Sequence, residues 1–94
     1  KPIGVVKIGG NQFDEAGFFE SLTDYLEKVD LAPILVHGGG RAIDRLQDRL
    51  GMEPVKIDGL RRSRPEELEV ALMALCGAVN KRLVAKLAAE GVAA

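Results

Sequence analysis

Two glycine-rich turns contain the residues of this sequence that are best suited to chemistry: KIGGN at residues 7–11 and HGGGR at residues 37–41. Each turn follows an apolar run rich in Ile and Val and precedes a helical pattern. Glycine lets a ligand approach the main chain closely, and the free N–H groups at the start of the next helix attract an anion. The turns therefore predict a site for one or two anionic groups, with tight ligand-free turns as the alternative.

A lysine and a histidine stand beside these turns. Lys7 lies in the first apolar run, two residues before its glycines, where an anion would give the ammonium group a partner. The alternative is an ordinary lysine on an edge strand. His37 ends the second run, and its expected role is to hydrogen-bond the turn rather than to take part in chemistry.

Two well-known phosphate-binding motifs do not account for the turns. The P-loop pattern, in which a glycine is followed after four residues by Gly-Lys-Ser/Thr, is absent. A dinucleotide fingerprint placed on Gly38, Gly40 and Ile43 is weak, because its last position needs a small residue and isoleucine is large.

The elements that position the turns alternate between strand and helix. We expect buried strands at 3–9 and 32–37, helices at 13–30 and 41–50, and a short edge strand at 53–58 that contains Pro54. The inward residues of the two helices are expected to be Phe18, Leu22, Tyr25, Leu26 and Val29, and then Ile43, Leu46 and Leu50.

One long helix is expected after residue 63. Ser63 and Glu66 have the spacing of a capping box, Pro65 suits the first turn, and Gly77 marks a possible kink. Its apolar stripe is Leu68, Leu72, Leu75, Val79, Leu83 and Leu87. We interpret this stripe, with Cys76 among it, as packing rather than chemistry, although its exposed face could pair with another subunit.

The alternation predicts an α/β fold in which parallel strands end at the same edge of the sheet, which is where open α/β sheets bind ligands. The 94 residues, 47% apolar, allow one small domain. A net charge of −1 argues against nucleic acid, and no apolar run reaches the roughly 20 residues of a membrane span. Because the start KPIGVVKIGG also lacks the long apolar centre of a signal peptide, we expect a cytoplasmic protein. Cys76 is the single cysteine, so we expect neither an internal disulfide nor a structural zinc site.

Four segments together resemble the amino-acid kinase family: VVKIGGN, VHGGG before a helix, DGLR, and GAVNK within the long helix. Within that family, the closest likeness is to members that phosphorylate N-acetyl-L-glutamate in arginine biosynthesis. The resemblance implies a three-layer αβα sandwich with a mainly parallel sheet, of which residues 1–94 form the N-terminal half that binds the acyl amino acid. It also implies phosphoryl transfer from ATP with Mg²⁺ to the side-chain carboxylate.

The resemblance also implies roles for the turn residues. Lys7 matches the lysine that stabilises the transferring phosphoryl group, and Gly9 and Gly10 match the glycines whose N–H groups meet the phosphates. Gly39 and Gly40 match the pair that binds the reacting carboxylate. That carboxylate has an unperturbed pKa of about 4.3, so it is ionised at neutral pH and needs no general base. Positioned N–H donors and a lysine then offset the charge of the transition state.

An arginine-rich segment follows DGLR. By resemblance, Arg61 matches the arginine that grips the α-carboxylate of the substrate; without the resemblance it would be read as part of a solvated basic turn with Arg62 and Arg64. The extra arginines leave open a sister activity, a kinase for aminoadipate or glutamate attached to an acidic carrier protein. The third glycine of the second turn, Gly40, favours acetylglutamate over that alternative.

Several expectations concern what lies outside these residues. A helix end with Gly91 as its cap and a new apolar start suggest that the chain is a fragment. The ATP-binding half and the residues that orient the metal would then lie beyond it, so no metal ligand is assigned here and the fragment alone is expected to be inactive. A homodimer through helix 64–90 is expected, and Asn80 and Lys81 are assigned helix packing and surface roles. The alternative outside enzymes is a non-catalytic phosphate- or nucleotide-binding module.

Overall fold

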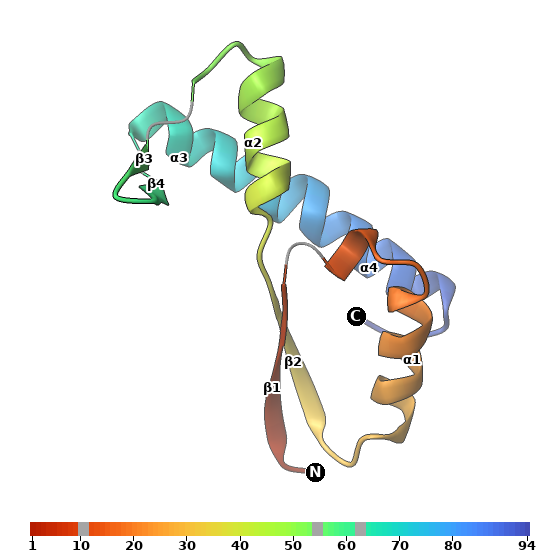
Figure 1. Ribbon diagram of the computed structural model, residues 1–94. Coiled ribbons are helices and arrows are strands. Elements are labelled where there is room, and N and C mark those ends of the chain that lie inside the picture. The colour runs from red at the N-terminus through yellow and green to blue at the C-terminus, as the bar shows by residue number, and fades with distance from the viewer. Residues whose placement is uncertain (10–11, 54–55, 62–63) are drawn as a thin grey trace.

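The computed structural model describes residues 1–9, 12–53, 56–61 and 64–94 (Figure 1). Two parallel strands and the helix that connects them form one end of the molecule. A long C-terminal helix runs from the opposite end to pack beside them. No helix within the described ranges is long and apolar enough to cross a membrane.

The sheet is formed by β1 (Ile3–Ile8) and β2 (Ala32–His37), which pair in parallel. The register runs from Ile3 opposite Ala32 to Ile8 opposite His37. Beyond the last pair, the Gly38 N–H donates to the Ile8 carbonyl at 3.4 Å. Both predicted strands and their parallel pairing are therefore confirmed, and the two strands end side by side.

The first helix is shorter than predicted. Residues Gln12–Asp14 form a 3-10 turn, and α1 spans only Phe18–Lys28. Gly17 separates the two with a φ of 78°, a left-handed conformation that glycine adopts without strain. The expected continuous helix over 13–30 is therefore wrong at its start, because a glycine turn breaks it.

The second helix, α2, spans Gly40–Arg49 and is followed by a turn at Gly51, whose φ is 73°. Ile43 is buried as predicted and Leu46 is half-buried. Leu50 is 54% exposed, so its predicted inward position is wrong. The helix has ended before Leu50, which therefore no longer follows the helical periodicity.

The hydrophobic core lies between one face of the sheet and two helices, α1 and α4 (Asn80–Ala89). Its buried members are Ile8 from β1, Leu22 from α1, and Leu83 and Leu87 from α4. Half-buried side chains pack around them: Phe13, Phe18, Phe19, Leu26, Leu35 and Val92. This core fastens the strands, and with them the two glycine turns, to the helices.

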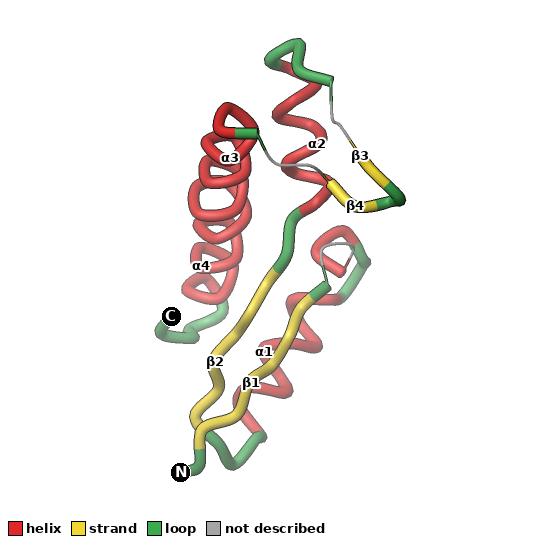
Figure 2. The backbone as a smooth tube through the Cα atoms, turned by 90° about the vertical axis from the view of Figure 1, so that its left-hand side faces the viewer, coloured by secondary structure: helices red, strands yellow, loops and turns green. Residues whose placement is uncertain are grey.

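The opposite face of the sheet is uncovered. Ile3, Val5, Ile34 and Val36 point to this face and are 73%, 69%, 51% and 44% exposed. The α/β class with a parallel sheet is confirmed, but the expectation that both strands are buried is wrong for this face. Among the described residues the helices cover one face of β1 and β2, as Figure 2 shows, so the chain contributes one helical layer to a sandwich.

The long helix is continuous, but it contains a wider segment. α3 (Pro65–Leu72) leads into a π-helical segment, Met73–Val79, and then into α4. Pro65 occupies the first turn as predicted, whereas Ser63 of the predicted capping box lies outside the described residues. A kink was predicted at Gly77. Gly77 lies instead within the π segment, where one residue is added to the helical turn.

The π segment changes which residues of the long helix face the core. The buried positions are Glu67, Val70, Ala74, Val79, Leu83 and Leu87. The step of five from Ala74 to Val79 corresponds to one extra residue in the turn. The predicted stripe is confirmed at Val79, Leu83 and Leu87, but it is wrong at Leu68 and Leu72, which are 55% and 64% exposed, and Cys76 is also exposed.

A small hairpin joins α2 to α3. Its strands, β3 (Lys56–Ile57) and β4 (Leu60–Arg61), are antiparallel, and Asp58 and Gly59 form the turn with φ values of 51° and 78°. Asp-Gly is typical of such two-residue turns. The predicted strand at 53–58 is confirmed only at its end, its Pro54 lies outside the described residues, and β4 was not predicted.

Candidate functional site

The two glycine turns leave adjacent strands at the same edge of the sheet. Ile8 and His37 form the last register pair, so Gly9 and Gly38 come next side by side. This is the carboxyl edge, where parallel α/β sheets bind ligands. Gly10, predicted to contact phosphate, lies outside the described residues.

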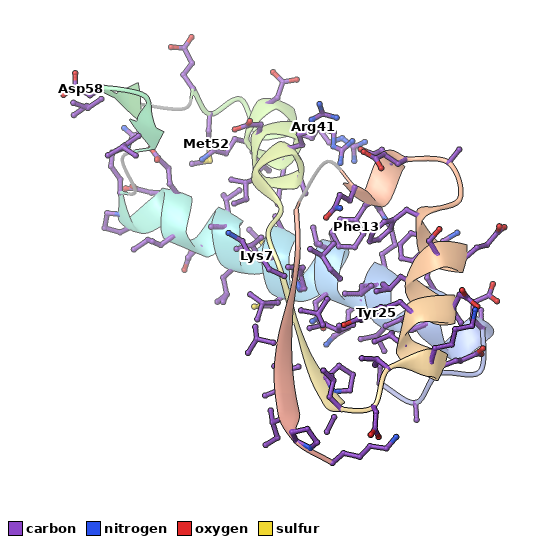
Figure 3. The ribbon with its side chains drawn as sticks, turned by 60° about the horizontal axis from the view of Figure 1, so that its bottom comes forward. Lys7, Phe13, Tyr25, Arg41, Met52 and Asp58 are labelled. Atoms are coloured by element: carbon purple, nitrogen blue, oxygen red, sulfur yellow. The ribbon has the colours of Figure 1, made fainter. Side chains whose placement is uncertain are left out.

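Lys7 lies at this edge, opposite Val36 in the register. Its side chain is exposed and belongs to the face that Val5 and Val36 share, not to the face packed against the helices. Lys7 makes no hydrogen bond or ion pair with the described residues, and Figure 3 labels it beside the strands. An ammonium group without a partner is available to an anion held at the ends of β1 and β2.

The Gly9 amide has a partner that the sequence did not indicate. Its N–H donates to Gln12 Oε1 at 2.7 Å, in an exposed position. The side-chain oxygen of Gln12 therefore stands where an oxygen of a phosphate or carboxylate could accept the same hydrogen bond. The pattern of a glycine followed three residues later by a side chain with an acceptor was a signal that could have drawn attention to Gln12.

The second turn contains two glycines with different surroundings. A Cβ on Gly39 would lie 2.7 Å from Leu75 Cδ2 and 3.0 Å from Val79 Cγ2, so this glycine allows the turn to approach the π segment. A Cβ on Gly40 would have no atom within 4 Å. Gly40 is the first residue of α2, whose first turn contains no acidic residue. The partial positive charge of this helix start therefore has no carboxylate of its own element to offset it.

His37 ties the second turn to α4. Its Nδ1 is 2.9 Å from the Gly38 carbonyl oxygen, and its Nε2 is 3.3 Å from Asn80 Nδ2. A neutral imidazole with its proton on Nδ1 satisfies both contacts, since Nδ1 then donates to the carbonyl and Nε2 accepts from the amide. The role predicted for His37 is confirmed.

Asn80 has a larger part in the site than predicted. Its Oδ1 accepts a hydrogen bond from Lys81 Nζ at 3.0 Å while its amide contacts His37. Its side chain thus connects the long helix to the glycine turn, which is a structural role as predicted, although the sequence did not indicate His37 as the partner.

The hairpin with Arg61 lies beyond the carboxyl ends of β1 and β2, on the side away from α1 (Figure 1). Arg61 pairs with Lys56 in the backbone register; the Arg61 side chain and Arg62 are not described. Arg64 pairs with Glu67, whose side chain is 1% exposed. This ion pair gives Arg64 a structural partner at the start of α3, and the Arg64 side chain remains 48% exposed.

No group of three metal-ligating side chains occurs among the residues that the structure describes. The structure brings two adjacent glycine turns and a helix start to one sheet edge, near Lys7, which has no partner among the described residues. Such a set of donors can bind a carboxylate or a phosphate and offset charge that develops between them.

Comparisons with known proteins identify the family of this chain. The model of the amino acid kinase family matches residues 2–94. An acetylglutamate kinase of Roseiflexus sp. is 44% identical over 91 residues, which are 97% of this chain and 35% of that protein. An acetylglutamate kinase of Methanopyrus kandleri is 42% identical over 88 residues, 94% of this chain and 33% of that protein.

A solved structure, smu.665 from Streptococcus mutans UA159, has the same fold. It superposes with a TM-score of 0.79 at 34% sequence identity, covering 96% of this chain and 37% of that one. The chain thus spans about a third of the length of the relatives it matches. The match over residues 2–94 and these likenesses lead to one conclusion: the chain belongs to the amino acid kinase family.

Proposed function

We propose that the protein containing this chain transfers the γ-phosphoryl group of ATP to the side-chain carboxylate of N-acetyl-L-glutamate. In this proposal residues 1–94 form the half that binds the acyl amino acid. The protein would act in the cytoplasm. The observation that carries the proposal is the pair of glycine turns at adjacent strand ends, near Lys7, which pairs with none of the described residues. The relatives named acetylglutamate kinase support the choice of substrate.

The second glycine turn would bind the acceptor. The Gly40 N–H, at the open start of α2, and the neighbouring Gly39 amide would hold the reacting carboxylate. The contacts of His37 with Gly38 and Asn80 would keep these amides in place. Arg61 would hold the α-carboxylate by two parallel hydrogen bonds, for which a guanidinium is suited.

The first turn would bind the transferred group. The N–H groups of Gly9 and Gly10 would contact phosphate oxygens, which requires Gln12 Oε1 to leave the Gly9 amide. Lys7 would offset the negative charge that builds up between nucleophile and phosphoryl group. ATP with Mg²⁺ would supply the phosphoryl group, and residues of this chain would contribute N–H donors and the ammonium group of Lys7.

The test is an assay of the full-length gene product that contains this chain. We expect ADP release only when N-acetyl-L-glutamate is present, with an acyl phosphate that hydroxylamine traps as a hydroxamate. Equal rates with free glutamate would contradict the acyl specificity. Nucleotide binding without any turnover, unaffected by acetylglutamate, would favour a non-catalytic module instead.

A lysine variant tests the catalytic assignment. Replacing Lys7 by Ala is expected to lower kcat by roughly 10²-fold or more with a smaller change in KM, because the ammonium group acts mainly on the transition state. Lys1→Ala is the control, since Lys1 is also exposed but lies at the other end of β1. An unchanged kcat in Lys7→Ala would remove this residue from the mechanism.

A homodimer through the long helix is part of the proposal. Leu68, Leu72 and Met73 are 55%, 64% and 52% exposed on that helix, and they form an apolar surface that a second copy could cover. Sedimentation of the full-length protein is expected to show a dimer, and Leu68→Glu with Leu72→Glu is expected to give a monomer. A dimer that survives both changes would place the interface elsewhere.

A further inference from the structure

An arginine-lined groove lies between α2 and the long helix. Its volume is about 260 Å³. Arg45 and Arg49 contribute from α2 and Arg82 contributes from α4. The rest of the lining is apolar and consists of Leu46 and three alanines, Ala42, Ala74 and Ala78.

The spacing of these residues explains the shape of the groove. Arg45 and Arg49 are four residues apart, so both lie on one side of α2. On the long helix, Ala74, Ala78 and Arg82 are also spaced by four. The alanines leave room between the two helices, and the three guanidinium groups stand at the rim of that space.

The groove has positive charge without compensation. Its lining contains no acidic residue, and the sequence from 70 to 89 contains none either. Arg45, Arg49 and Arg82 make no hydrogen bond or ion pair with any described residue. Because the whole chain has a net charge of −1, this cluster is a local feature and not a consequence of a basic protein.

The positive surface continues toward the second glycine turn. A smaller hollow next to the groove shares Ala42, Arg45 and Arg82 with it and adds Arg41. Arg41 is 3.8 Å from an oxygen of Asp14, so its charge is partly compensated. The uncompensated charge is therefore concentrated in the groove, around Arg45, Arg49 and Arg82.

We propose that this groove binds a small oxyanion with at least two negative charges, such as a polyphosphate or a polycarboxylate. Guanidinium groups bind carboxylate and phosphate oxygens through paired hydrogen bonds, and a multivalent anion allows more than one arginine to bind at once. The volume fits a small molecule rather than a folded partner. Because the ligand bridges α2 and α4, its binding stabilises the folded protein.

The test follows the alanine methyl signals of the groove in the full-length protein. With selective ¹³C-methyl labelling of alanine, titration with pyrophosphate and separately with citrate is expected to shift the signals of Ala74 and Ala78 until they saturate. Tighter binding of pyrophosphate would identify the ligand as a polyphosphate, and tighter binding of citrate would identify it as a polycarboxylate. Ala74 and Ala78 line the groove but not the smaller hollow that contains Gly39, so their signals report binding in the groove.

Two double variants with the same change in net charge separate a site from general attraction. Arg45→Gln with Arg82→Gln is expected to weaken binding at least tenfold. Lys1→Gln with Lys28→Gln, both in exposed positions at the far end of the molecule, is expected to change it less than twofold. If the arginine double variant does not fold, the single change Arg49→Gln on an exposed side chain is compared with Lys28→Gln, which changes the net charge equally.

Three results would overturn the proposal. The first is the absence of a saturable shift at Ala74 and Ala78 with either probe. The second is an equal loss of binding in both double variants, which would indicate attraction by net charge alone. The third is saturation by poly-L-glutamate at concentrations where neither small anion binds, which would assign the groove to an acidic protein chain.

Discussion

Gly39 and Gly40 are neighbours in one turn, but the structure gives them different reasons to be glycine. Gly39 is buried against Leu75 and Val79, whereas the space around Gly40 is open. The first glycine thus serves the packing of the turn on the π segment. The second leaves the start of α2 accessible, which is the property that the proposed carboxylate site needs.

A pair of alanine variants separates these two roles. Gly39→Ala is expected to lower the free energy of unfolding by about 1–3 kcal/mol, because its Cβ overlaps Leu75 and the stiff, β-branched Val79. Gly40→Ala is expected to change it by less than about 0.5 kcal/mol. Urea unfolding followed by circular dichroism measures both, and equal losses in the two variants would refute the packing role.

Glu67 is a buried carboxylate at the start of α3. One of its oxygens pairs with Arg64, and the other, Oε2, has no hydrogen-bond partner among the described residues. Replacing Arg64 by Ala is expected to destabilise the protein by about 1–3 kcal/mol, because it leaves the buried charge without a partner. The measurement is the midpoint of urea unfolding.

A matched variant shows whether the cost comes from the unpaired charge. Glu67→Met keeps the volume of the side chain and removes its charge, and it is expected to be neutral or stabilising. In that background, Arg64→Ala should cost less than about 0.5 kcal/mol, since no carboxylate is left. If Arg64→Ala lowers the free energy of unfolding as much in the Glu67→Met background as in the original protein, Arg64 acts through contacts other than Glu67.

The long helix changes its inward face at the π segment. The core-facing positions are Val70 and Ala74 up to the start of this segment, and Val79, Leu83 and Leu87 from its end onward. A regular helix would have carried the first set into a different register. The extra residue therefore allows the two halves of one helix to pack on α2 and on the sheet, respectively.

Single-residue deletions test the register of this helix. Deleting the exposed Cys76 is expected to convert the π segment to regular helix while Val79, Leu83 and Leu87 keep facing the core, so the free energy of unfolding falls by less than about 2 kcal/mol. Deleting Val84 from α4 is expected to turn the buried Leu87 away and to cost about 2–5 kcal/mol. Thermal unfolding of both proteins makes the comparison, and a larger loss from the Cys76 deletion would contradict the account.

The molecule as a whole leaves one apolar sheet face without a cover. Ile3, Val5, Ile34 and Val36 would each gain from burial, yet no described residue packs on them. The relatives are about three times as long as this chain. In proteins of that length, residues outside the matched segment can pack on the corresponding face of the sheet. The uncovered face also contains Lys7, which places the proposed catalytic group beside that surface.

Polar substitutions on this face distinguish exposure from burial. In the 94-residue chain, Ile34→Thr with Val36→Thr is expected to change the free energy of unfolding by less than about 1 kcal/mol and to reduce binding of a hydrophobic dye. Ile8→Thr is the buried control, since Ile8 is 2% exposed, and it is expected to cost about 2 kcal/mol or more. If the double variant does not fold, and the original chain does not bind the dye, the face is already covered.

The order and type of most elements could be read from the sequence, because they depend on residues close together in the chain. Apolar runs before Gly9 and Gly38 predicted both strands and their common edge, and the same pattern predicted where Lys7 and His37 stand. The family motifs were likewise local. Arg61 and Gly10 remain predictions, since the structure does not describe the Arg61 side chain or residue 10.

By contrast, only the tertiary structure decided which face of each element is covered. Periodicity places Leu68 and Leu72 in one stripe with Leu83, but an added residue in the π segment rotates them apart, and that choice depends on packing against α2 and the sheet. The Asn80 contact with His37 and the groove of Arg45, Arg49 and Arg82 join residues far apart in the chain. Local sequence preference carries no information on such encounters, because they form only when separate elements pack together.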